Sequence, residues 1–121
     1  MKNLLVTGGA GFIGSNFIHY LLQQDLDVKI VNLDALTYAG SLENLKDLPH
    51  PERHLFVNGN ITDRTLLDQL FSEHKIDTVI NFAAESHVDR SILNPGVFVE
   101  TNVVGTYTLL EAARRAWIVD K

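Results

Sequence analysis

The chain has 121 residues, of which 45% are apolar, and it carries a formal net charge of −5 at pH 7. This length and composition suit one globular domain, residues 1–121, and exclude a disordered chain. The negative charge excludes a general electrostatic attraction to nucleic acid or to an anionic membrane. The sequence has no cysteine, which excludes disulfides and is compatible with a reducing, cytoplasmic setting. There is no apolar run of about 18 residues and no secretory signal pattern, so we expect no membrane partner.

Hydrophobic periodicity predicts strands and helices that alternate along the chain. Strands are expected at 3–6, 28–33, 55–57 with an extension to 61, and 78–82; helices are expected at 12–24, from a cap at Thr62 or Asp63 onward, and at 94–117. Residues 41–45 are predicted to form a short helical turn, and residues 50–54 a surface loop with solvated histidines at both ends. We predict no metal site. The alternation predicts an α/β fold of the Rossmann type: a doubly wound parallel sheet that stops after about four strands, in the order 3-2-1-4.

A glycine-rich stretch joins the first predicted strand to the first predicted helix. Gly9, Gly11 and Gly14 fit the pattern G-x-G-x-x-G. We expect Gly9 to permit the sharp turn out of the strand, Gly11 to let a pyrophosphate approach the backbone, and Gly14 to let helix and strand pack closely. The start of the helix would offer free N–H groups and the positive end of its dipole to the phosphates. A glycine turn without a ligand is the alternative.

An acidic residue, Asp34, ends the second predicted strand, twenty positions after Gly14. A carboxylate there can accept hydrogen bonds from the hydroxyl groups of an adenosine ribose, and it would repel a 2′-phosphate. The first arginine of the chain is Arg53, so no guanidinium follows Asp34 closely to receive that phosphate. The sequence therefore favours NAD over NADP as the cofactor. The alternative is a plain turn role for Asp34.

Several strings of the sequence resemble a known family. Residues 7–14 (TGGAGFIG) resemble the amino-terminal fingerprint of the extended short-chain dehydrogenase/reductase family. Residues 34–45 (DALTYAGSLENL) and 81–92 (NFAAESHVDRSI), supported by residues 100–106 (ETNVVGT), are similar within it to the dTDP-glucose 4,6-dehydratases. The resemblance covers the whole chain. Other sugar-nucleotide epimerases and dehydratases share the glycines but match the two longer strings less well.

The resemblance implies a reaction and a set of contacts. In these dehydratases NAD takes a hydride from C4 of the sugar of dTDP-glucose, water is eliminated across C5 and C6, and the hydride returns to C6. Asn60 stands where the family usually has aspartate, which implies weakened but not lost binding of the adenine. The resemblance places the nucleotide sugar against Ser86 and His87. It places the cofactor against a larger set: Gly8, Gly11, Phe12, Ile13, Gly14, Asp34, Thr37, Asn60, Ile61, Phe82, Ala83, Ala84, Glu85, Ser86 and Thr101.

The family's proton-transfer groups are not found in this chain. None of its three tyrosines has a lysine four positions later, as the family motif Tyr-x-x-x-Lys requires, and the acid/base Asp-Glu pair that follows the fifth strand is absent. We therefore expect no catalytic residue here and interpret the chain as the amino-terminal part of a longer enzyme, which the resemblance implies is a homodimer. The alternatives are a non-catalytic module that senses NAD and another NAD-dependent sugar-nucleotide epimerase or dehydratase. On the residues alone, 85–91 could equally be a polar turn with a solvated His87.

Overall fold

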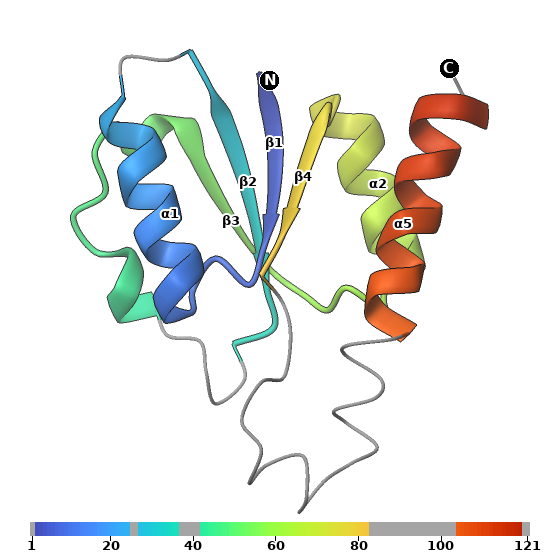
Figure 1. The fold of residues 1–121 in the computed structure, drawn as a ribbon, viewed down its shortest axis with the longest axis horizontal. Coiled ribbons are helices and arrows are strands. Elements are labelled where there is room, and N and C mark those ends of the chain that lie inside the picture. Colours follow the sequence, from blue (N-terminus) through green and yellow to red (C-terminus); the bar gives the residue numbers. More distant parts are fainter. Residues whose placement is uncertain (1, 25–26, 37–41, 83–103, 120–121) are drawn as a thin grey trace, which may run out of the picture.

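A computed structural model describes residues 2–24, 27–36, 42–82 and 104–119. In these residues a parallel sheet forms the centre, and Figure 1 shows helices covering both of its faces. The strands, in the spatial order β3-β2-β1-β4, are β1 (Asn3–Thr7), β2 (Lys29–Asp34), β3 (His54–Asn58) and β4 (Thr78–Asn81). The helices are α1 (Phe12–Gln23) on one face, and α2 (Arg64–His74) and α5 (Thr106–Arg114) on the other. The predicted α/β class and strand order are confirmed.

The two faces of the sheet carry separate hydrophobic cores. Successive residues of a strand point to opposite faces, and this is why β1 is apolar at consecutive positions: Leu4 and Val6 face α1, whereas Leu5 faces α2 and α5. The side chains of these three residues are fully buried. Burying one such side chain contributes roughly 1.5–3 kcal/mol. The central strand is therefore stabilised from both sides, as is typical of parallel sheets.

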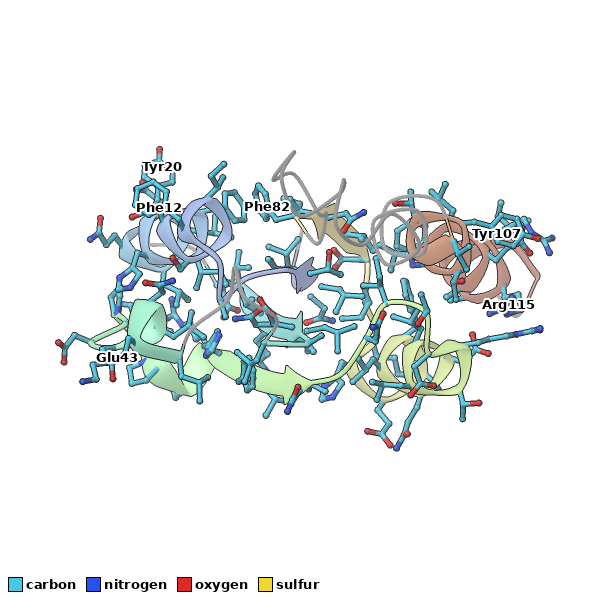
Figure 2. The ribbon with its side chains drawn as sticks, turned by 90° about the horizontal axis from the view of Figure 1, so that it is seen from below. Phe12, Tyr20, Glu43, Phe82, Tyr107 and Arg115 are labelled. Carbon is cyan, nitrogen blue, oxygen red and sulfur yellow. The ribbon has the colours of Figure 1, made fainter. Side chains whose placement is uncertain are left out.

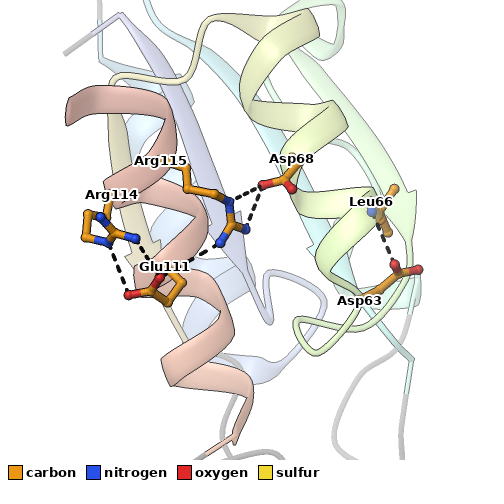
Figure 3. Close-up of polar contacts among 6 residues, drawn as sticks. All are labelled: Asp63, Leu66, Asp68, Glu111, Arg114 and Arg115. Carbon is orange, nitrogen blue, oxygen red and sulfur yellow. Dashed lines mark hydrogen bonds and ion pairs between the residues drawn. The ribbon is translucent and has the colours of Figure 1, made fainter. Parts of the chain in front are cut away.

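Both ends of helix α2 have a clear physical cause. The Asp63 carboxylate accepts a hydrogen bond from the Leu66 N–H at 3.2 Å (Figure 3), which confirms Asp63 as the cap. Lys75, with a φ of 52°, ends the helix in a left-handed conformation. Helix α5 continues as a π-helical turn, η4 (Arg115–Val119), and Arg115 pairs with Asp68 of α2 at 2.8 Å. The two helices are thus joined by an ion pair as well as by their core.

The connection between β2 and β3 differs from the prediction. Residues 42–45 form the expected turn, η1 (Leu42–Leu45), but Pro51–Arg53 forms a second 3-10 turn, η2, instead of a loop. His54 is the first residue of β3 and is partly buried, with its Nε2 3.1 Å from Nδ2 of Asn32. Burial, and to a lesser extent the nearby His19, lowers the pKa of His54 below its ordinary value of 6.5. The prediction of a solvated His54 was therefore wrong.

Two further strand boundaries differ from the prediction, and one helix start is not described. Strand β3 ends at Asn58 and does not extend to Ile61, because Asn60 turns the chain by accepting hydrogen bonds from Thr62. Strand β4 ends at Asn81, one residue before the predicted end, and its four residues are partly buried or exposed. The predicted start of the last helix, near Asn94, lies outside the described residues. No helix in the described part of the chain is both long and apolar enough to cross a membrane.

Candidate dinucleotide-binding site

The carboxyl ends of all four strands meet at one edge of the sheet, and each strand ends there in a polar residue. These residues are Thr7, Asp34, Asn58 and Asn81. The Thr7 hydroxyl donates a hydrogen bond to the amide oxygen of Asn81, and the Asn81 amide donates to the Thr106 hydroxyl of α5 at 3.5 Å. Open α/β sheets bind their ligands at this edge. Figure 2 views the molecule from this edge.

The turn between β1 and α1, residues 8–11, is here called the glycine turn, and it takes its shape at Gly8. Its φ of 71° lies in the left-handed region, which glycine adopts without steric cost. The Gly8 N–H donates to the Leu33 carbonyl of β2 at 2.9 Å, and the Gly8 carbonyl accepts from the Gly11 N–H at 3.2 Å. The chain thus leaves β1 beside the end of β2 and enters α1 at once. The sharp turn that we predicted at Gly9 is made at Gly8.

Gly9 and Gly14 are required for packing. A Cβ on Gly9 would lie 2.1 Å from Oδ1 of Asn32 and 2.6 Å from Cδ1 of Ile18. A Cβ on Gly14 would lie 2.4 Å from the Gly8 carbonyl oxygen and 2.9 Å from Cα of Gly9. The predicted reason for Gly14, close packing of the helix on the end of the strand, is confirmed. The reason for Gly9 is contact with β2 and α1.

The amino end of α1 is open to an anion. Gly11 occupies its cap position without a side-chain hydrogen bond, and no acidic residue lies in the first turn. The first N–H groups of any helix lack intrahelical partners, and the helix dipole adds positive potential there. The side chains of Phe12 and Ile13 are 77% and 69% exposed, so neither belongs to the buried face of α1. This helix start, preceded by the glycine turn, has the features of a phosphate-binding site.

Asp34 lies directly beside this turn. Its carboxylate is buried, with Oδ2 accepting from the Ala10 N–H at 2.8 Å and Oδ1 accepting from the Leu36 N–H at 2.7 Å. Leu36 has a φ of 55°, so the chain turns away sharply after β2. An ionised carboxylate offers about four lone-pair sites. Asp34 can therefore hold the turn and still accept hydrogen bonds from a ligand hydroxyl.

The other predicted cofactor residues fall into two groups. Among the described ones, Asn60 is exposed, Ile61 is 3% exposed within the core, and Phe82 packs on Phe17 with ring centroids 5.6 Å apart. Ile61 can thus meet a ligand through its backbone only. Seven predicted positions lie outside the described residues: Thr37, Ala83, Ala84, Glu85, Ser86, His87 and Thr101. The described part of the chain has no cluster of histidine, aspartate and glutamate that could hold a metal ion.

Sequence reasoning missed one contact to the turn. The Asn44 side chain, in η1, donates from Nδ2 to the Ala10 carbonyl at 2.8 Å. The two residues are 34 positions apart, and no local pattern signals the contact. Thr7 and Asn81 were missed as well. In their case a signal existed, because both are polar residues at the ends of predicted parallel strands.

Comparison with known proteins identifies the family of this site. The profile of the GDP-mannose 4,6 dehydratase family matches residues 5–121. The chain therefore belongs to the GDP-mannose 4,6 dehydratase family. Among curated relatives, the dTDP-glucose 4,6-dehydratase of Xanthomonas campestris pv. campestris (strain B100) is 56% identical to this chain over 117 residues. The match covers 97% of this chain and 33% of that protein. It is 51% identical over 114 residues to dTDP-glucose 4,6-dehydratase 1 of Escherichia coli (strain K12), covering 94% and 31%.

Solved structures agree with this membership of the GDP-mannose 4,6 dehydratase family. DesIV, a dTDP-glucose 4,6-dehydratase from Streptomyces venezuelae crystallised with NAD, is 48% identical with a TM-score of 0.89, covering 95% of this chain and 36% of DesIV. The UDP-glucose 4-epimerase of Thermotoga maritima, solved with UDP-glucose, is 32% identical with a TM-score of 0.84, covering 97% and 35%. The chain thus spans about a third of the length of its curated relatives. The higher identity is to the dehydratases, as the resemblance of residues 34–45 and 81–92 implies.

Proposed function

We propose that this chain binds NAD at the carboxyl edge of its sheet and forms the dinucleotide-binding part of a dTDP-glucose 4,6-dehydratase, which converts dTDP-glucose to dTDP-4-keto-6-deoxyglucose. One observation carries the proposal: the open amino end of α1 and the buried carboxylate of Asp34 lie on the two sides of one glycine turn. A dinucleotide offers a pyrophosphate to the amino end of the helix and a ribose diol to the carboxylate. The relatives named above, one of them solved with NAD, support this choice of ligand.

Each part of the site has a separate task in this proposal. The N–H groups of residues 12–14 bind the pyrophosphate, Asp34 orients the adenosine ribose, and Asn60 with the backbone of Ile61 lies beside the adenine. Phe82, residues 83–86 and Thr101 are proposed cofactor contacts at the reactive end, and Ser86 and His87 are proposed contacts to the nucleotide sugar. When bound, NAD supplies reversible hydride acceptance. The chain's own contribution is to bind and orient it.

The cofactor preference is the first expected result. Titration calorimetry with the 121-residue chain is expected to give at least about tenfold tighter binding of NAD than of NADP, because a 2′-phosphate would meet the Asp34 carboxylate. Arg53 precedes the amino end of β3, whereas Asp34 pairs with Asn58 at its carboxyl end. The arginine is therefore at the opposite edge of the sheet. Equal or tighter binding of NADP would contradict the proposed use of NAD.

The proposal assigns binding, and no proton transfer, to this chain. The 121 residues contain no Tyr-x-x-x-Lys, and a general acid or base must lie within hydrogen-bond reach of the proton it moves. This observation also favours the second candidate, a module that binds NAD without catalysis. Conversion of dTDP-glucose by the 121-residue chain alone would contradict the assignment. A cytoplasmic location stays a prediction.

We also propose that the chain associates with a second copy of itself through α5. The buried side of this helix consists of Leu109, Ala112 and Ala113, and the opposite side exposes a stripe of large apolar residues. The stripe runs from just before α5 into η4 and comprises Val104, Tyr107, Leu110 and Ile118, with exposed fractions from 47% to 72%. Trp117 is not part of it, because its ring packs against Phe71 of α2 and its indole N–H donates to the Ile76 carbonyl. Large apolar side chains exposed together on a surface helix are typical of an interaction site. Glu111 and Arg114, which form an ion pair at 3.0 Å, lie between Leu110 and Ile118 in the chain. The short strand β4 is a poor template for edge pairing, so the helix is the better candidate.

The mass in solution tests the association. Light scattering at micromolar concentration is expected to give twice the mass of the chain, 13.5 kDa. Leu110→Glu, which places a charge in the middle of the stripe, is expected to reduce the mass to that of a monomer. Thr65→Glu, on the exposed surface of α2, is the matched control and should leave the dimer intact. A monomeric wild-type chain would contradict the proposal.

A further inference from the structure

Ala10 is the one residue of the glycine turn whose two backbone polar groups are both bound by side chains of other elements. It is fully buried. Its N–H donates to Oδ2 of Asp34 at 2.8 Å, and its carbonyl accepts from Nδ2 of Asn44 at 2.8 Å. The two side chains come from the end of β2 and from η1. The peptide groups on both sides of Ala10 are thus held in orientation from two directions.

Asn44 is itself fixed in place. Its backbone carbonyl lies 3.2 Å from Nε2 of His19 in α1, a contact in which the ring nitrogen must donate because a carbonyl oxygen only accepts. The neighbouring Leu45 packs against the core on the α1 face of the sheet. The turn η1 is therefore attached to the helix that follows the glycine turn. Through Asn44 it is also attached to the glycine turn.

The orientation of the Ala10 carbonyl decides what a bound anion meets. The peptide between Ala10 and Gly11 leads directly into the open start of α1. If its carbonyl were released, the peptide could rotate and present an oxygen where the pyrophosphate requires N–H groups. A buried carbonyl held by a side-chain donor resists this rotation. A site held in its binding geometry before the ligand arrives binds more tightly, because less ordering remains to be done.

We propose that Asn44 is a positioning residue for the pyrophosphate of the dinucleotide. It does not touch the ligand; it holds the Ala10 carbonyl away from the phosphates, while Asp34 holds the N–H of the same residue. The inference rests on the proposed binding of NAD at this turn. It predicts that Asn44 matters for ligands with a pyrophosphate and not for the adenosine portion alone, because Asp34 stays in place.

The test compares three ligands with three variants of the full 121-residue chain. Asn44→Ala is expected to weaken binding of NAD and of ADP by about tenfold or more, the loss expected for one hydrogen bond to a buried group. Adenosine has no pyrophosphate and still meets Asp34. Its binding, measured by ligand-observed NMR titration, is therefore expected to change less than about twofold. Asn16→Ala is the matched control. It removes an amide-to-carbonyl bond of the same length, 2.8 Å to Phe12, which stays within α1.

Each outcome decides between a positioning role and another role. Unchanged NAD affinity in Asn44→Ala would overturn the inference, and so would a parallel loss of adenosine and NAD. Asn44→Asp keeps the size of the side chain and replaces the donor by an oxygen, so it should reproduce the loss even if the alanine variant folds poorly. Unfolding of both Asn44 variants would assign Asn44 a structural role only and would overturn the inference. A wild-type chain that binds neither NAD nor ADP would instead contradict the proposed function.

Discussion

Gly14→Ala is expected to lower both the free energy of unfolding and the affinity for NAD, whereas Gly11→Ala is expected to lower the affinity alone. The two glycines lie three positions apart in one motif, and each substitution adds the same methyl group. They differ in what that methyl group meets. The pair therefore separates the packing role of the motif from its binding role.

At position 14 the added methyl group meets backbone atoms that cannot rotate away. Its Cβ would lie 2.4 Å from the Gly8 carbonyl oxygen and 2.9 Å from Cα of Gly9. Alanine gains about 1 kcal/mol over glycine in helix propensity, but overpacking of this kind typically costs about 1–3 kcal/mol. Because the whole turn must move, we expect a net loss of stability and a Tm lowered by roughly 5 °C. The displaced turn would also misplace the phosphate-binding N–H groups.

At position 11 the backbone accepts a side chain without strain. Gly11 has a φ of −75° and a ψ of 173°, which any residue adopts. The Tm of Gly11→Ala should therefore stay near that of the wild type. In the proposed complex the methyl group projects where the pyrophosphate approaches the backbone, and we expect at least about a hundredfold loss of NAD affinity, equivalent to ~2.7 kcal/mol.

Thermal melts with and without NAD, together with calorimetric titration, distinguish these results. Gly11→Ala should melt like the wild type but show no shift on addition of NAD. Unchanged NAD affinity in Gly11→Ala would mean that the pyrophosphate does not approach the backbone there. A wild-type Tm in Gly14→Ala would show that the turn relaxes at no cost, which the backbone contacts at Gly14 argue against.

The strand order could be predicted from sequence because it depends on features that are local or nearly so. Short apolar runs such as 3–6 and 78–82 alternate with amphipathic helical segments, and the handedness of parallel crossovers leaves few arrangements. The role of Gly14 was also predictable, because the motif places it where helix and strand must touch. In these cases a single physical requirement coincides with a recognisable spacing.

Other features depend on contacts that no local pattern encodes. Gly8 and Gly9 are adjacent, and the sequence alone does not say which one takes the left-handed φ. In the fold Gly8 takes it, while Asn32 and Ile18 fill the space beside Gly9. His54 was predicted to be solvated because residues 50–54 were predicted to form a surface loop. In the fold it lies against Asn32, 22 positions earlier in the chain. The same reason explains why Asn44 was overlooked.

Asp34→Ala is expected to weaken NAD binding by roughly 1–3 kcal/mol and to reduce the preference for NAD over NADP. The wild-type carboxylate is proposed to accept hydrogen bonds from the ribose, and a 2′-phosphate in the same place would be repelled. Removing the carboxylate removes both effects, so the NAD affinity falls while the penalty against NADP disappears. The ratio of the two dissociation constants should therefore approach one.

The same substitution is expected to lower stability, because Asp34 also holds the turn. Without it the buried Ala10 N–H loses its partner at 2.8 Å, and an unsatisfied buried donor costs about 1–3 kcal/mol. The Leu36 N–H is only partly buried, so water can replace its lost partner. Asp34→Asn keeps one acceptor oxygen but turns an NH2 group toward one of the two N–H donors. It should therefore retain part of the stability and lose the repulsion of the 2′-phosphate.

Titrations of NAD and NADP against the wild type and both Asp34 variants, combined with urea unfolding, measure the two effects separately. Asn58→Ala serves as the control, because Asn58 is an exposed polar residue that pairs with Asp34 in register at the same edge of the sheet. Its NAD-to-NADP ratio should equal that of the wild type. If Asp34→Ala weakened both cofactors equally and kept their ratio, Asp34 would only support the turn. If instead the ratio falls toward one, the carboxylate itself selects the cofactor, because the loss of turn geometry alone would weaken NAD and NADP alike.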